Sequence, residues 1–133
     1  TLKAEGVTVV PVLHKDVHLD CCVGLLPPRR AHEKPALIMK QLTILDTRTV
    51  LEMVRRRVRE VIVCDGWDDP LTCPMNMLWL NAETAISTTA AVNTNQKIAA
   101  MGYEVLAHPY DTFLNYQGGV RCSVAPLERK EMT

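Results

Sequence analysis

The chain has 133 residues, of which 47% are hydrophobic and 23% are charged, an ordinary globular composition that excludes an intrinsically disordered protein. Fifteen Lys and Arg residues balance fifteen Asp and Glu residues, so the chain lacks the positive surplus expected of a protein that binds nucleic acid or acidic membranes. No apolar run reaches the length of about 18 residues that a membrane-spanning helix needs, and the first residues lack the apolar segment of a signal peptide, so we expect a cytoplasmic protein whose five cysteines are reduced.

The first half of the chain contains apolar segments of strand length and one helical pattern. After the N-cap candidates Asp46 and Thr47, apolar residues lie three and four positions apart, which predicts an amphipathic helix. The arginines within residues 55–59 cover much of its remaining surface, and we interpret them as a solvated helix face rather than an RNA-binding patch. Strands are expected at residues 7–12, 18–26, 36–39 and 61–64.

The second half repeats this order of elements. Two apolar segments flank residues 81–83 and predict a hairpin, and a helix follows from Asn93 or Thr94. Gly102 is a typical stop signal just beyond the end of this helix. Strands are expected at residues 75–80, 84–88, 103–107 and 121–125.

The same unit therefore occurs twice. The expected order of elements is strand, strand, helix, strand both in residues 19–64 and in residues 75–107. One further strand is expected before these units, at 7–12, and one after them, at 121–125. Short strands alternating with helices predict an α/β fold, and the recurrence predicts structural repeats of about 50 residues. The length fits a single domain over residues 1–133.

Two short motifs combine side chains that can carry chemistry. His18 and Asp20 lie two positions apart on an expected strand, so both point to the same face, where a carboxylate must be paired or line a cavity. Gly118 and Gly119 precede Cys122, and glycines allow the backbone to turn sharply or approach a ligand just before the thiol. Each motif alone is common and is also compatible with a purely structural role.

We expect neither a metal nor an organic cofactor. His14, His18, Asp20 and Cys21 have ligand-type side chains, but no Cys-x-x-Cys pair or second cluster completes a tetrahedral set. No Gly-rich phosphate-binding loop follows a predicted strand.

In combination and in this order, the motifs resemble the C-terminal half of the guanidino-group modifying enzymes, the pentein superfamily. This superfamily includes arginine deiminases, agmatine deiminases, dimethylarginine dimethylaminohydrolases and amidinotransferases, and its members form a five-bladed propeller of ββαβ units. The resemblance implies that residues 1–133 form about half of such an α/β propeller. The matching segments are His18-Leu19-Asp20, Asn76-Met77-Leu78-Trp79-Leu80, residues 93–105 and Gly118-Gly119-Val120-Arg121-Cys122-Ser123.

The resemblance also implies roles for individual residues. Cys122 would attack the carbon of a guanidinium group, because a thiolate is the strongest protein nucleophile near neutral pH. His18 would protonate the leaving nitrogen and then activate water, and Asp20 would hold the guanidinium through paired hydrogen bonds. Further substrate-binding residues would be Asn76, Gly118 and Gly119, and for Asn76 a role in a turn or at the start of a strand fits the sequence equally well.

The expected reaction is hydrolysis of a C–N bond in arginine or a related small guanidino compound. If an amine rather than water intercepts the covalent intermediate, the outcome is amidino transfer. A non-catalytic half-propeller that binds a partner is a second alternative, since a sheet edge that is left open favours pairing with another chain.

The sequence departs from the superfamily pattern in two ways. The N-terminal half, which normally supplies another carboxylate to the guanidinium, has no counterpart within the 133 residues, so we expect either a homo-oligomer or a preceding N-terminal half. Arg121 stands where relatives often carry His. On the expected strand it alternates with Cys122, which favours a side chain that points away from the pocket.

Overall fold

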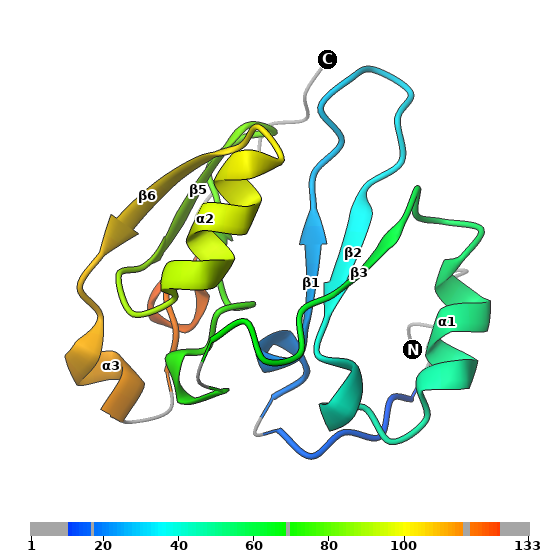
Figure 1. The fold of residues 1–133 in the computed structure, drawn as a ribbon, viewed down its shortest axis with the longest axis horizontal. Helices are drawn as coiled ribbons and strands as arrows, with labels where there is room; N and C mark the ends of the chain where they lie inside the picture. Colours follow the sequence, from blue (N-terminus) through cyan, green and yellow to red (C-terminus); the bar gives the residue numbers. More distant parts are fainter. Residues whose placement is uncertain (1–10, 17, 69, 116–117, 126–133) are drawn as a thin grey trace.

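The computed structural model describes residues 11–16, 18–68, 70–115 and 118–125. Each half of the chain forms a three-stranded sheet with a helix in the connection between its second and third strands (Figure 1). The two predicted ββαβ units are therefore confirmed. The strand expected at 7–12 lies mostly outside the described residues, and Pro11 and Val12, which are described, are not part of a strand.

The elements of the first unit are β1 (Val23–Leu26), β2 (Ala36–Met39), α1 (Thr47–Val54) and β3 (Val61–Val63). The strand order is β1-β2-β3, with β1 antiparallel and β3 parallel to β2. In this register Ile38 of the central strand lies between Gly24 and Ile62. α1 supplies the crossover that a parallel pair of strands requires.

The elements of the second unit are β4 (Leu78–Trp79), β5 (Thr84–Thr88), α2 (Val92–Ala100) and β6 (Glu104–His108). They repeat the arrangement of the first unit, since β4 is antiparallel and β6 is parallel to the central strand β5. Figure 1 shows α2 lying against this sheet, on the opposite side of the molecule from α1.

A carboxylate caps the N-terminus of each of the helices α1 and α2, but its position in the sequence differs. The Asp46 carboxylate accepts a hydrogen bond from the backbone of the first turn of α1 at 3.2 Å, as a typical N-cap residue does. At the start of α2 this role falls to Asp68 in a distant loop, which accepts from the backbone N–H of Asn93 at 3.0 Å and of Thr94 at 2.7 Å. Gly102 ends α2 with φ +90°, which confirms the predicted stop.

Several short helices were not predicted. The first strand begins only at Val23, because residues 19–21 form a 3-10 helix. α1 ends at Val54, and the arginines of residues 55–57 follow it in an exposed turn in which the Arg57 N–H donates to the Val54 carbonyl at 2.7 Å. The additional short helices are η1 (Leu19–Cys21), η2 (Gln41–Thr43), η3 (Pro70–Thr72), α3 (Asp111–Asn115) and η4 (Arg121–Ser123).

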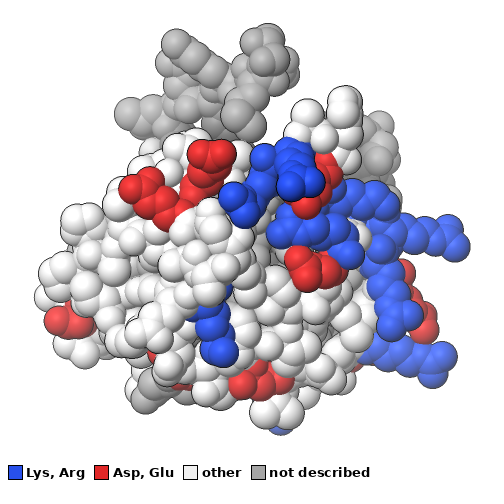
Figure 2. Space-filling view, turned by 45° about the horizontal axis from the view of Figure 1, so that its top comes forward, with Lys and Arg blue, Asp and Glu red and all other residues white. Residues whose placement is uncertain are grey.

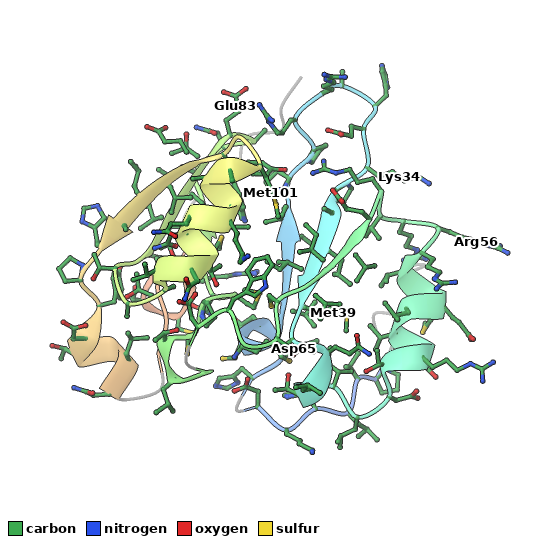
Figure 3. The ribbon with its side chains drawn as sticks, in the orientation of Figure 1. Lys34, Met39, Arg56, Asp65, Glu83 and Met101 are labelled. Atoms are coloured by element: carbon green, nitrogen blue, oxygen red, sulfur yellow. The ribbon has the colours of Figure 1, made fainter. Side chains whose placement is uncertain are left out.

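The central strand β2 is buried on both faces, as its unbroken apolar sequence indicates. Its alternate residues belong to two hydrophobic clusters, with Ile38 in a cluster that continues into the second unit and Met39 in a cluster against α1. Figure 3 shows Met39 at the end of β2 nearest to α1. One face of β2 therefore packs against the second unit and the other face packs against α1.

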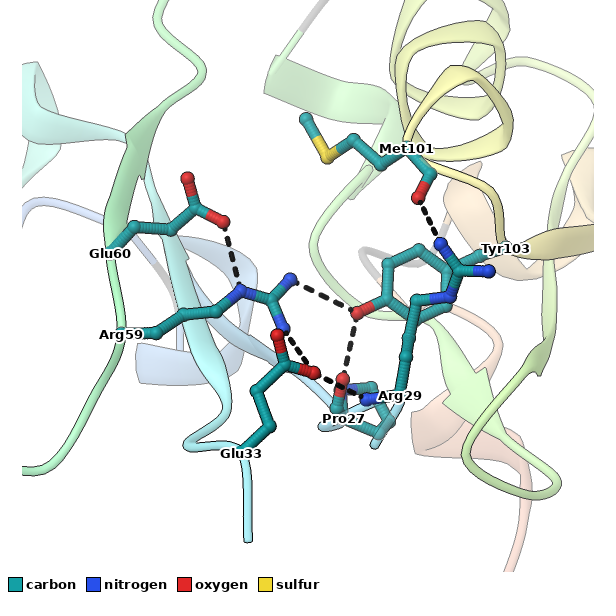
Figure 4. Close-up of polar contacts among 7 residues, drawn as sticks. All are labelled: Pro27, Arg29, Glu33, Arg59, Glu60, Met101 and Tyr103. Carbon is teal, nitrogen blue, oxygen red and sulfur yellow. Dashed lines mark hydrogen bonds and ion pairs between the residues drawn. The ribbon is translucent and has the colours of Figure 1, made fainter. Parts of the chain in front are cut away.

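A polar network joins the two units at the end of the β1–β2 hairpin (Figure 4). The Tyr103 hydroxyl donates to the carbonyl of Pro27 at 2.7 Å and accepts a hydrogen bond from Arg59 at 3.4 Å. Arg59 in turn forms an ion pair with Glu33 at 3.2 Å, and the Tyr103 ring packs edge-on against Trp79. These contacts set the relative position of β1 and β4.

Charged side chains are unevenly distributed over the surface. Figure 2 shows Lys and Arg gathered on one side of the visible face, with acidic residues among them. Ion pairs between neighbouring side chains, such as Arg48 with Glu52 and Arg59 with Glu60, are typical of a solvated surface. Within the described residues, no helix is long and apolar enough to span a membrane.

Candidate active site

One buried amide side chain joins three segments that are far apart in the sequence. Nδ2 of Asn76 donates a hydrogen bond to Oδ2 of Asp20 at 2.8 Å, and Oδ1 accepts one from the backbone N–H of Arg121 at 2.8 Å. The same oxygen accepts from the backbone N–H of Cys122 at 3.3 Å and lies 3.5 Å from the Cys122 Sγ. The structure therefore brings together Asp20, Asn76 and Cys122, three of the residues predicted for the site.

A tight turn orients the Asn76 side chain. Its backbone N–H donates to the carbonyl of Cys73 at 2.9 Å, and Cys73 has φ +45°, in a region that residues other than glycine seldom occupy. All of residues 73–77 are buried. The strand expected at 75–80 is shorter than predicted and begins only at Leu78, because the chain first completes this turn.

Asp20 reaches Asn76 from a 3-10 helix and not from a strand. His18 is the N-cap residue of η1, and its carbonyl accepts from the Cys21 N–H at 3.1 Å. The prediction that His18 and Asp20 share one face of a strand is therefore wrong, because the backbone closes into a helical turn directly after His18.

The structure does not connect the His18 side chain to the other predicted residues. This side chain is exposed, and among the described residues no hydrogen bond or ion pair joins its imidazole to Asp20, Asn76 or Cys122. His18 is placed near the site by its position two residues before Asp20.

The glycine pair is a packing feature of the site. A Cβ atom at Gly119 would lie 2.4 Å from Oδ1 and 2.7 Å from Cβ of Asn76, so only glycine leaves room for the amide. Gly119 is buried, and Gly118 before it is partly buried. The close approach that the sequence predicted is therefore made by Gly119 toward Asn76, within the protein.

Cys122 is the exposed cysteine of the five, all of which are free thiols. Burial raises the pKa of Cys21 and of Cys64 to about 12, and it also raises the pKa of Cys22 and Cys73. A buried thiol that keeps its proton is a poor nucleophile. The accessible thiol is therefore that of Cys122, the residue that the sequence predicts as the nucleophile.

Arg121 does not point away from the pocket as expected. The strand predicted at 121–125 is instead the 3-10 helix η4, in which the Ser123 N–H and hydroxyl both donate to the Val120 carbonyl, at 3.3 and 2.7 Å. The alternation that a strand imposes is therefore absent. Arg121 lines the large groove described next.

A groove of about 1210 Å³ runs between the first strands of the two units. β1 and β4 are the outer strands of their sheets on this side, and neither has a further strand partner among the described residues. Leu25 and Leu80 line the groove with 54% and 53% of their surface exposed, and Asp20 and Arg121 add opposite charges to it. The groove thus connects the candidate carboxylate with an open apolar surface.

Neither this groove nor the central place of Asn76 was predicted. The sequence predicts Asn76 as a substrate-binding residue, although an Asn within an apolar segment also indicates a buried side chain that needs internal hydrogen-bond partners. Among the described residues, no group of three or more His, Cys, Asp or Glu side chains is placed to hold a metal ion.

The fold matches solved structures of arginine dihydrolases. The N-terminal domain of ArgZ, an arginine dihydrolase from the ornithine–ammonia cycle in cyanobacteria, superposes in its product-bound form with a TM-score of 0.67 and 22% identity, over 91% of this chain and 42% of that one. The same domain covalently bound to a reaction intermediate gives 0.66 and 22%, over 91% and 43%. A mutant of AgrE in complex with L-arginine gives 0.61 and 19%, over 84% and 16%.

At these identities the comparison shows the fold, and the predicted partial pentein-type propeller is confirmed. The chain spans less than half the length of the structures that it matches. The sequence matches no protein-family model and no curated protein.

Proposed function

We propose that this chain carries the nucleophile and one guanidinium-binding carboxylate of an enzyme that hydrolyses a C–N bond of arginine or a related small guanidino compound. The observation that carries the proposal is the joining of Asp20 and Cys122 through a single amide group, Asn76. This arrangement lies on a fold shared with arginine dihydrolases, one of which was captured with a covalently bound reaction intermediate.

The proposed reaction begins with attack on the substrate. Asp20 accepts hydrogen bonds from guanidinium N–H groups and so orients the planar cation. The thiolate of Cys122 adds to the guanidinium carbon, the C–N bond to the leaving nitrogen breaks, and that nitrogen departs with a proton from His18. An amidino-thioether on Cys122 remains.

Hydrolysis then restores the enzyme. His18, now deprotonated, accepts a proton from water as the water oxygen adds to the same carbon. The C–S bond breaks, and the thiolate leaves with the electron pair of that bond. The product is a ureido compound, and Cys122 and His18 are back in their starting forms.

The groove between β1 and β4 needs a cover for this chemistry. A cationic substrate gains most from a carboxylate when water is excluded, and the groove is wide and open. We propose that further ββαβ units cover it and supply a second carboxylate, either from an N-terminal half of the same polypeptide or from other copies of the chain. The matched structures support this, because more than half of each has no counterpart in this chain.

Labelling with chloroacetamidine, a thiol-reactive cation shaped like a guanidinium, tests the proposed function. We expect Cys122 to react faster with it than with neutral iodoacetamide, and we expect arginine to slow this reaction. The four buried cysteines serve as internal controls, and peptide mapping assigns the label. Equal rates with both reagents and no protection by arginine would contradict a guanidinium site in this chain, which would then be a piece of a larger enzyme or a non-catalytic half-propeller.

A turnover assay complements the labelling. The protein is incubated with arginine, and the ureido product and released ammonia are measured with and without an acceptor amine. Water as the acceptor gives ureido product, whereas transfer gives a new guanidino compound. Cys122→Ser abolishes either reaction while leaving the fold intact.

A further inference from the structure

We infer that Asn76 is a positioning residue that sets the Asp20 carboxylate and the Cys122 loop relative to each other and does not itself contact the substrate. This inference rests on the proposed function. It also replaces the role that the sequence predicted for Asn76, which was substrate binding.

The partners of Asn76 fix the orientation of its amide. Backbone N–H groups can only donate, so the atom that faces Arg121 N at 2.8 Å and Cys122 N at 3.3 Å must be the oxygen. An ionised carboxylate can only accept, so the atom that faces Asp20 Oδ2 at 2.8 Å must be the nitrogen. Both assignments agree, and a flipped amide would lose all three interactions.

Asn76 is too enclosed to bind a substrate. Only 1% of its surface is exposed, and the backbone of Gly119 packs directly on its side chain. Its chain neighbours Met75 and Met77 line the groove, whereas Asn76 does not. Its polar atoms are therefore directed into the protein, toward the Asp20 carboxylate and the backbone at Cys122.

The backbone of Asn76 strengthens the same connection. Its carbonyl accepts from the Arg121 N–H at 3.2 Å, in addition to the bond that this N–H makes with the side-chain oxygen. The turn of residues 73–76 and the segment before Cys122 are thus held together by main-chain and side-chain contacts at one point. A displacement of Asn76 would move the nucleophile and release the carboxylate together.

A double-mutant cycle with chloroacetamidine tests this coupling. We expect Asn76→Ala to lower the preference of Cys122 for chloroacetamidine over iodoacetamide by about tenfold, as loss of a hydrogen bond to a charged group does. Asp20→Ala should lower it by at least as much. The preference compares two reagents at the same thiol, so a displaced Cys122 loop affects both rates and the loss of preference comes through Asp20. The double variant should therefore be no worse than Asp20→Ala within about threefold.

A matched control separates positioning from general destabilisation. Asn95 is a partly buried Asn whose Nδ2 donates to the Thr88 carbonyl at 2.8 Å, and it does not line the groove, so Asn95→Ala should leave the preference unchanged. The buried cysteines report folding, since they react only when the chain opens. If Asn76→Ala exposes them, Asn76→Ser replaces it, because its smaller hydroxyl can still accept from the loop.

The outcomes distinguish the inference from the proposed function. An unchanged preference in the folded Asn76 variant, or additive losses in the double variant, overturns the positioning role while the guanidinium site stands. Absence of any preference in the wild-type protein overturns the proposed function, and the positioning role with it.

Discussion

The hydroxyl of Tyr103 in the second unit donates a 2.7 Å hydrogen bond to the backbone carbonyl of Pro27, just beyond β1 of the first unit. Only 3% of the Tyr103 surface is exposed, and Arg59 donates to the same hydroxyl at 3.4 Å. This contact fixes the separation of β1 and β4, the two strands that border the groove beside the candidate site.

Removing this hydroxyl should weaken the joint between the units. In Tyr103→Phe the Pro27 carbonyl and Arg59 lose a partner, and we expect the free energy of unfolding to fall by about 1–2 kcal/mol in urea titrations. Tyr110→Phe is the matched control, because the hydroxyl of Tyr110 contacts Ser123 at 3.3 Å in an exposed position. Equal losses in both variants would show that the Pro27 contact is not important for stability.

The repeated unit was predictable because each element has a strong local signal. β2 is a continuous apolar segment, α1 follows the N-cap Asp46, and Gly102 ends α2. The start of α2 shows the limit of such signals. Its cap is Asp68, more than twenty residues earlier in the chain, and no local pattern identifies a partner at that distance.

The membership of the candidate site stays a prediction from sequence motifs, whereas the geometry of its residues differs from the expected one. The motifs point to Cys122 and Asp20 and predict that both lie on strands, but both lie in 3-10 helices. Short 3-10 turns depend on a few backbone hydrogen bonds and leave no periodic pattern in the sequence. Arg121 was expected to point away from the pocket because neighbouring side chains alternate along a strand. This expectation is wrong because residues 121–123 form a 3-10 helix.

The open groove should make the isolated chain associate. Leu25 and Leu80 expose more than half of their surface in it, and contiguous apolar surface beside unpaired strand edges favours pairing. We expect Leu25→Lys to weaken association by about tenfold or more in sedimentation experiments, because it places a charge in the buried interface.

Leu42→Lys is the control for this experiment. Leu42 is 77% exposed and does not line the groove, so its replacement should not change the association. A chain that remains monomeric before any substitution would contradict the expectation that copies of the chain cover the groove for one another.

The buried cysteines should make stability fall at high pH. Burial raises the pKa of Cys64 from its ordinary value of 9.0 to about 12, so the folded state retains a proton that the unfolded state releases. The stabilisation is complete below pH 9 and is lost as the pH rises through 12. Urea midpoints measured from pH 8 to 11 should therefore decline, and Cys64→Ala should reduce the slope of this decline.

Met75→Leu provides the comparison for the cysteine experiment. Met75 lies 3.5 Å from the Cys64 sulfur, and this change keeps the volume and adds no titrating group. It should shift all midpoints equally and leave the slope intact. If Cys64→Ala also leaves the slope intact, other groups cause the alkaline loss.

Gly119 should tolerate no side chain, for a reason that links stability to the site. An added Cβ would lie 2.4 Å from the Asn76 Oδ1, and because that amide is held by the Arg121 N–H and by Asp20, it cannot move without breaking those bonds. We expect Gly119→Ala to lower the free energy of unfolding by about 1–3 kcal/mol and to reduce the chloroacetamidine labelling of Cys122 relative to iodoacetamide. Gly66→Asn is the control, since Gly66 has φ +72° with open space around its Cβ position and Asn tolerates that backbone conformation. A Gly119→Ala protein with wild-type stability and labelling would mean that the segment before Cys122 adjusts freely, and the amide of Asn76 would then not define the geometry of the site.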